Sequence, residues 1–129
     1  MVLQQMKSTI TSDVGDERLV TRSLMGAREA LGLTLAQTGA IIGVSESTMK
    51  RYSLGNAVIS APKVMELALG LIRIYQALFA VVGGDLAQMR HWMTTPNRHF
   101  RNGQPDELAQ TYQGLAELNV YLDAMPGRH

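Results

Sequence analysis

The chain has 129 residues, no cysteine, and 12 basic against 11 acidic side chains, for a net charge of +1. This length suits one helical core, or two small helical modules that share one, and excludes a large multidomain enzyme. The lack of cysteine excludes disulfides, thiolate catalysis and cysteine-based zinc sites, and the near-neutral charge excludes a general attraction to nucleic acid. The first residues lack the layout of a signal peptide, so we expect a cytoplasmic location.

Apolar residues recur with helical spacing and rarely alternate, which predicts an all-α fold. Residues 1–15 are expected to form a flexible N-terminal arm. A first helix should follow from about Asp16 to Leu31 and end at Gly32. The side chains expected to face the core are Leu19, Val20, Leu24, Ala27 and Leu31.

Two short helices flank a turn that begins at Gly43, which predicts a helix-turn-helix within residues 16–60. Thr34 can cap the first helix while Gln37 reaches back to the backbone N–H of the cap, which is a capping box. Gly43 supplies the backbone freedom of the turn, and Ser45 can cap a second helix over residues 46–53. These features are typical of a module that places a helix in the major groove of DNA.

The second helix is expected to have one polar face and one apolar face, the latter formed by Met49 and Tyr52. On the polar face, Arg51 can read guanine and Ser47 can hydrogen-bond to several bases. Phosphate contacts are expected from Lys50 and from the start of the first helix. The candidate DNA-binding residues are therefore Thr34, Gln37, Ser45, Glu46, Ser47, Lys50 and Arg51. The alternative is an ordinary helical hairpin with a solvated surface.

Residues 61–84 contain the most apolar segment, with Ser60 as the expected helix cap and Pro62 in the first turn. The segment is long enough for a membrane span, but Lys63, Glu66 and Arg73 interrupt it. A helix that is apolar almost all round must be covered, so we expect it to pair with its copy in a homodimer. The alternative is a central helix wrapped by the other helices of its own chain.

Residues 85–129 differ in character from the preceding segment. Residues 90–101 contain three arginines, two histidines and no acid, whereas residues 106–123 contain four acids and no base. Pro105 marks a helix start, and the last helix should bury Leu115, Leu118, Leu122 and Met125. His91 and His99 lack a third ligand, and no nucleophile has a base at a suitable spacing, so we expect no metal, cofactor or small-molecule substrate and no enzymatic activity.

The segments RHWMTTPNRHF, GQPDEL and GLAELNVYLDAMPGR resemble the C-terminal domain of the MbcA/ParS/Xre antitoxin family. Together with the helix-turn-helix, the resemblance covers about residues 17–128. It implies a dimeric antitoxin that binds the promoter of its own operon. It also implies that the C-terminal domain blocks a cognate RES-domain toxin, a consumer of NAD, by covering its active site.

On this resemblance the toxin-binding residues are expected to be Trp92, Asn97, Arg98, Arg101, Tyr121, Asp123, Met125 and Arg128. Without it, Trp92 is a core anchor, Asn97 belongs to an ordinary turn, and the arginines are solvated. The chain departs from the family pattern at Thr38 and Gly39, which predicts weaker packing of the helix-turn-helix, and at Pro126, where a basic residue is common.

A second function explains the first 60 residues equally well. The chain can be a free-standing transcriptional regulator whose C-terminal domain binds an effector or only oligomerises. This alternative leaves the segment from Trp92 to Asn97 and the YLDAM ending unexplained.

Overall fold

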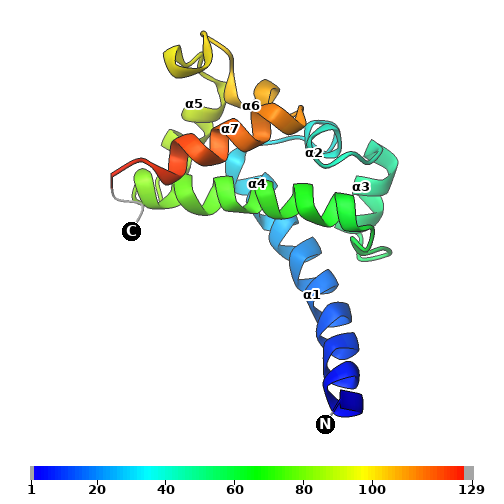
Figure 1. Cartoon of the computed structure of the whole chain (residues 1–129). Helices are drawn as coiled ribbons and strands as arrows, with labels where there is room; N and C mark the ends of the chain where they lie inside the picture. Colours follow the sequence, from blue (N-terminus) through cyan, green and yellow to red (C-terminus); the bar gives the residue numbers. More distant parts are fainter. Residues whose placement is uncertain (1, 127–129) are drawn as a thin grey trace.

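The computed structural model describes residues 2–126, with side chains from residue 15 onward, and this part of the chain is all helical apart from turns and one isolated bridge between Asn97 and Gly103 (Figure 1). The all-α prediction is therefore confirmed. The elements in chain order are α1 (Val2–Leu31), α2 (Leu35–Ile42), α3 (Glu46–Ser53), α4 (Pro62–Val81), α5 (Leu86–Thr94), the 3₁₀ turn η1 (Arg98–Phe100), α6 (Pro105–Leu108) and α7 (Tyr112–Asp123).

Helix α1 begins at Val2, not near Asp16, and its N-terminal part extends away from the other helices (Figure 1). The predicted start of the first helix is therefore wrong, because residues 2–15, which belong to the expected arm, continue the helix. No proline interrupts residues 2–31, and a single glycine such as Gly15 costs a helix only about 1 kcal/mol. The prediction for Leu19 is also wrong, since this side chain is 57% exposed.

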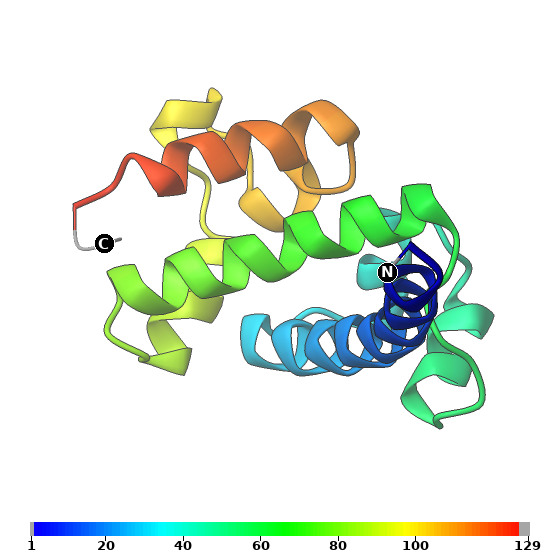
Figure 2. The same ribbon diagram turned by 60° about the horizontal axis from the view of Figure 1, so that its bottom comes forward.

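Helix α4 is the centre of the fold, and α1 and α7 lie on opposite sides of it (Figures 1 and 2). Helices α2 and α5 also contact it. Helix α4 thus packs against other helices of its own chain, while Leu69 and Phe79 of α4 remain 43% and 45% exposed. By length and composition alone α4 is able to cross a membrane, as many core helices are. Ala61, not Ser60, occupies its N-cap without a side-chain hydrogen bond, and Pro62 is in the first turn as predicted.

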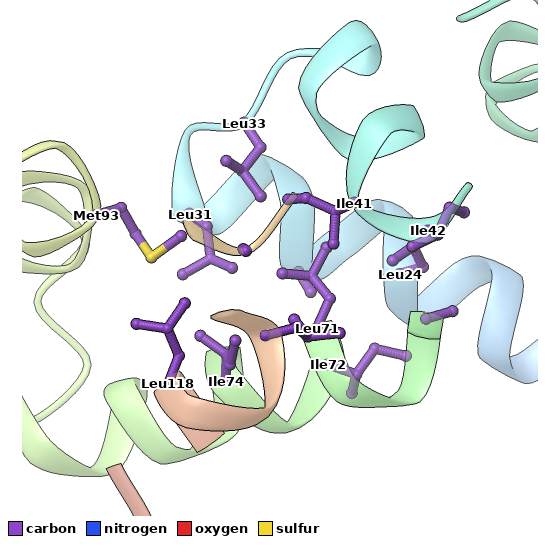
Figure 3. Packing of buried hydrophobic residues seen from close by; sticks show 14 of the residues in the cluster. Leu24, Leu31, Leu33, Ile41, Ile42, Leu71, Ile72, Ile74, Met93 and Leu118 are labelled. Atoms are coloured by element: carbon purple, nitrogen blue, oxygen red, sulfur yellow. The ribbon is translucent and has the colours of Figure 1, made fainter. Parts of the chain in front are cut away.

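A single hydrophobic cluster joins the helix-turn-helix to the C-terminal segment (Figure 3). Met93 from α5 and Leu118 from α7 belong to the same cluster as Leu24 from α1 and Ile42 from α2, with Leu71 of α4 between them. Because apolar burial is the main stabilising term in folding, the two halves of the chain depend on each other for stability.

The packing of α2 against the turn requires a glycine at position 39. A Cβ atom on Gly39 would lie 2.6 Å from the carbonyl oxygen of Val44. Its neighbour Thr38 is fully buried, and the Thr38 hydroxyl donates to the Thr34 carbonyl at 2.8 Å. The expectation that these two residues weaken packing is therefore wrong, because both fit tightly.

Candidate functional site

Helix α3 has the bounds predicted for a recognition helix and presents a polar face to solvent. The Ser45 hydroxyl accepts a hydrogen bond from the Thr48 N–H at 3.1 Å and so caps the helix. Met49 and Tyr52 are buried on the inner face. The residues exposed on the outer face are Glu46, Ser47, Lys50 and Arg51. The division of α3 into two faces is therefore confirmed.

The start of α2 is closed by the predicted capping box. The Gln37 N–H donates to the Thr34 hydroxyl at 3.0 Å, and the Thr34 N–H donates to the Gln37 side-chain oxygen at 2.9 Å. These two side chains are therefore already engaged with the helix terminus. A phosphate at this end would meet the positive end of the helix dipole and the first free amides of α2.

The cations of α3 are free to meet a negatively charged partner. Neither Lys50 nor Arg51 forms an ion pair with a described residue, and both are exposed. Tyr52 lies beneath them, and its burial raises the pKa of its phenol above the usual 10.0, although the positive charge of Arg51 opposes this shift. Tyr52 is thus a neutral anchor that holds the basic end of α3 on the core.

In the C-terminal segment, Tyr121 is the centre of an aromatic cluster. Its ring stacks on Trp92 with a centroid distance of 6.4 Å and lies 4.7 Å from His99 and 5.2 Å from Phe100. Trp92 and Tyr121 are both half-buried. These contacts tie α5, η1 and α7 together, so the two rings have a structural role whether or not a partner also touches them.

Asn97 shapes the loop that carries the two candidate arginines. Its side chain accepts from the His99 N–H at 2.9 Å, and its backbone N–H donates to the Gly103 carbonyl at 3.0 Å. Arg98 and Arg101 are exposed beside it, and Arg101 adopts a left-handed backbone with φ 56°. The structure thus brings these three residues together, with Asn97 turned to its own loop and the arginines in solvent.

The remaining candidate residues lie near the end of α7. Asp123 forms an ion pair with Arg73 of α4 at 3.1 Å, and Met125 is half-buried just after the helix. Arg128 lies outside the described residues. Helix α7 ends at Asp123, before Pro126, so only Leu115, Leu118 and Leu122 of the expected apolar face are helical and buried.

The sequence analysis missed an apolar strip on the outer face of α7. Tyr112 and Val120 are 73% and 71% exposed, and with Ala116 they line a shallow, mostly apolar hollow. The signal was their spacing of four residues, which places all three on one helix face. Large apolar side chains exposed together commonly mark a surface for another protein.

The described part of the chain contains no group of three His, Cys, Asp or Glu side chains able to hold a metal ion. Asp106 is buried but accepts a hydrogen bond from the Gln104 side chain at 2.8 Å at the start of α6, where an acid stabilises the helix dipole. Its role is therefore explained by the local structure.

Comparison with known proteins assigns both halves of the chain. Residues 15–73 match the antitoxin Xre-like helix-turn-helix domain, and residues 77–128 match the antitoxin Xre/MbcA/ParS C-terminal toxin-binding domain. The chain is 30% identical over 112 residues to the mycobacterial cidal antitoxin MbcA of Mycobacterium bovis and to that of Mycobacterium tuberculosis. The alignment covers 83% of this chain and 91% of each relative. The chain therefore belongs to the Xre/MbcA/ParS family of antitoxins, with a helix-turn-helix followed by a toxin-binding domain.

Proposed function

We propose that the protein neutralises a cognate RES-domain toxin, an enzyme that consumes NAD, by covering its active site, and that it represses its own operon in the cytoplasm. The toxin-binding domain matched over residues 77–128 carries the first part of this proposal. The exposed polar face of α3 supports the second part. The protein itself acts by binding and has no catalytic role.

Repression would depend on α3 in the major groove, with Arg51 and Ser47 at the base edges and Lys50 at phosphates. A recognition helix of eight residues makes few base contacts by itself. We therefore also propose a homodimer that places two copies of α3 on two half-sites. Helix α4 keeps Leu69 and Phe79 exposed, and we propose that this apolar outer side takes part in the dimer contact.

The outer face of α7 is the best candidate for the toxin contact. An exposed tyrosine and valine at the centre of an interface would be desolvated on binding, and such contacts usually dominate affinity. Arg98 and Arg101, which belong to the same matched domain as α7, can add contacts to acidic groups of the toxin.

Val120→Arg tests this surface. The variant should fold, because residue 120 is exposed, and should lose neutralisation of the toxin in a co-expression growth assay and co-purification with it. The matched control is Leu19→Arg, which places the same charge on an exposed apolar position of α1, outside the toxin-binding domain. Equal neutralisation by Val120→Arg and the control would remove α7 from the interface.

The contribution of the C-terminal tail needs a truncation that spares the core. Ending the chain after Gly114 would remove Leu118 and Leu122, which are fully buried, and so would unfold the domain. Ending it after Ala124 removes only Met125 and the residues beyond it. The shorter chain should keep promoter binding and lose toxin affinity; unchanged neutralisation would show that the tail does not enter the active site.

A free-standing regulator is less well supported, because it gives the toxin-binding domain no partner. The reading frame next to this gene should encode a RES-domain protein. Expression of that protein alone should lower cellular NAD and arrest growth, and co-expression with this antitoxin should restore both. A neighbour that is not toxic would refute the proposed partner.

A further inference from the structure

A cleft of about 760 Å³ opens between α1 and the loop that joins α3 to α4. Two arginines line it and no carboxylate does. Among its lining residues are Arg18, Thr21 and Arg22 of α1 and Tyr52 and Ser53 at the end of α3. The cleft is therefore basic in a chain whose net charge is only +1.

A buried hydrogen bond holds the loop against this part of α1. The Thr21 hydroxyl accepts from the Ile59 N–H at 2.9 Å and donates to the Glu17 carbonyl at 2.7 Å. Thr21 is 5% exposed and lies between Arg18 and Arg22, which are one helical turn apart and share a face. The position of both arginines relative to the loop is thus fixed by the fold.

The two arginines have no partner within the described part of the chain. Both are exposed, and neither takes part in an ion pair or a side-chain hydrogen bond there. Several other basic side chains do have an intramolecular partner, a carboxylate or a backbone carbonyl: Arg28, Lys63, Arg73 and Arg90. Arg18 and Arg22 are therefore available to an external anion.

The place of the cleft indicates which anion. Tyr52 and Ser53 at the end of α3 form part of its wall, so the cleft adjoins the end of the proposed recognition helix. Sugar-phosphate strands flank a helix that lies in the major groove. We infer that this cleft is a second DNA contact, in which Arg18 and Arg22 bind phosphates of the strand beside the groove read by α3. The inference rests on the proposed DNA binding.

Such contacts add affinity without reading sequence, and each gives a measurable salt dependence. Every phosphate neutralised contributes about 0.9 to the slope of log affinity against log salt concentration. Replacing both arginines should therefore lower the slope by about 1.8. The ratio of wild-type to variant affinity should fall about twelvefold between 50 and 200 mM salt, roughly as expected for two lost contacts.

The experiment compares full-length wild type with the double variant Arg18→Gln/Arg22→Gln, since glutamine keeps the helix propensity of arginine. The probes are a duplex from the promoter upstream of this gene and a random duplex of equal length. Binding of each protein to each duplex is measured by fluorescence anisotropy over a range of salt concentrations. The charge-matched control is Arg98→Gln/Arg101→Asn, measured without toxin; asparagine tolerates the left-handed backbone of residue 101. Thermal melts confirm that all three proteins are folded.

The slope of the cleft variant should fall on both duplexes while the preference for the promoter is kept, and the slope of the control should not change. If wild type binds the promoter and the cleft variant shows the same salt slope as wild type, this site is overturned and the proposed repressor is left intact. An equal fall in the control shows an effect of total charge and also overturns the site. Wild type that binds neither duplex refutes the proposed DNA binding and this site together.

Discussion

Replacing Gly114 with alanine tests the geometry on which the toxin-binding domain depends. The first turn of α7 passes so close to the end of α6 that a Cβ atom on residue 114 would overlap the carbonyl oxygen of Leu108. It would also lie 2.9 Å from the hydroxyl oxygen of Thr111, which caps α7 by accepting the Gly114 N–H. The Leu108 carbonyl belongs to the backbone, so the backbone must move.

The expected cost follows from three effects. Overpacking of a fixed neighbour costs about 1–3 kcal/mol, and loss of the Thr111 cap costs about 1 kcal/mol more. Alanine regains about 1 kcal/mol over glycine in a helix. Gly114→Ala should therefore lower the free energy of unfolding by about 1–3 kcal/mol, a large share of the roughly 5–15 kcal/mol of a typical domain.

Urea titration and thermal melting measure this change, and the melting temperature should fall by roughly 3–15 °C for a domain of this size. The control is Gly26→Ala on the exposed side of α1, where an added Cβ has no neighbour within 4 Å. That variant should gain up to about 1 kcal/mol. If both variants change stability in the same direction, or Gly114→Ala matches wild type, the close approach of α7 to Leu108 is wrong.

Three further predictions concern the helix-turn-helix. Gly39→Ala should lower stability by about 1–3 kcal/mol, because the added methyl meets the Val44 carbonyl, and a wild-type melting temperature would contradict this. Arg51→Ala should weaken promoter binding by about 1–3 kcal/mol and relax the preference at one base pair; unchanged preference in a set of mutated duplexes would exclude it as a reader. Burial raises the pKa of Tyr52, so its contribution to stability is complete below pH 10 and is lost as the pH rises through the raised pKa. Tyr52→Phe should therefore lose less stability than wild type above pH 10 in denaturation curves, and identical pH profiles would contradict this.

The helix-turn-helix was predictable from sequence because its signals are local. The Thr34 and Gln37 capping box and the Ser45 cap join residues three positions apart, so the sequence alone contains both partners. The bounds of α3 and its two faces followed from the same short-range rules. The order of motifs after Trp92 likewise indicated the family, because that order can be read from the sequence without knowing which residues are in contact.

Tertiary contacts decided what the sequence left open. Tyr121 and Trp92 are candidate partner contacts by position, and their stacking across 29 residues of chain, from 92 to 121, gives them a structural role in addition. Which side of α4 is buried likewise depends on which helices fold back onto it.

The sequence by itself thus determined the class of the protein and the bounds and faces of α3, because caps and helix faces are set by neighbours within a turn. Only the tertiary structure decided which surfaces remain available to partners. The outer face of α7 is free because its opposite face, with Leu118, is buried in the core. The cleft beside α3 exists because the Thr21 hydroxyl accepts a hydrogen bond from the distant Ile59 N–H, a pairing that no local rule predicts.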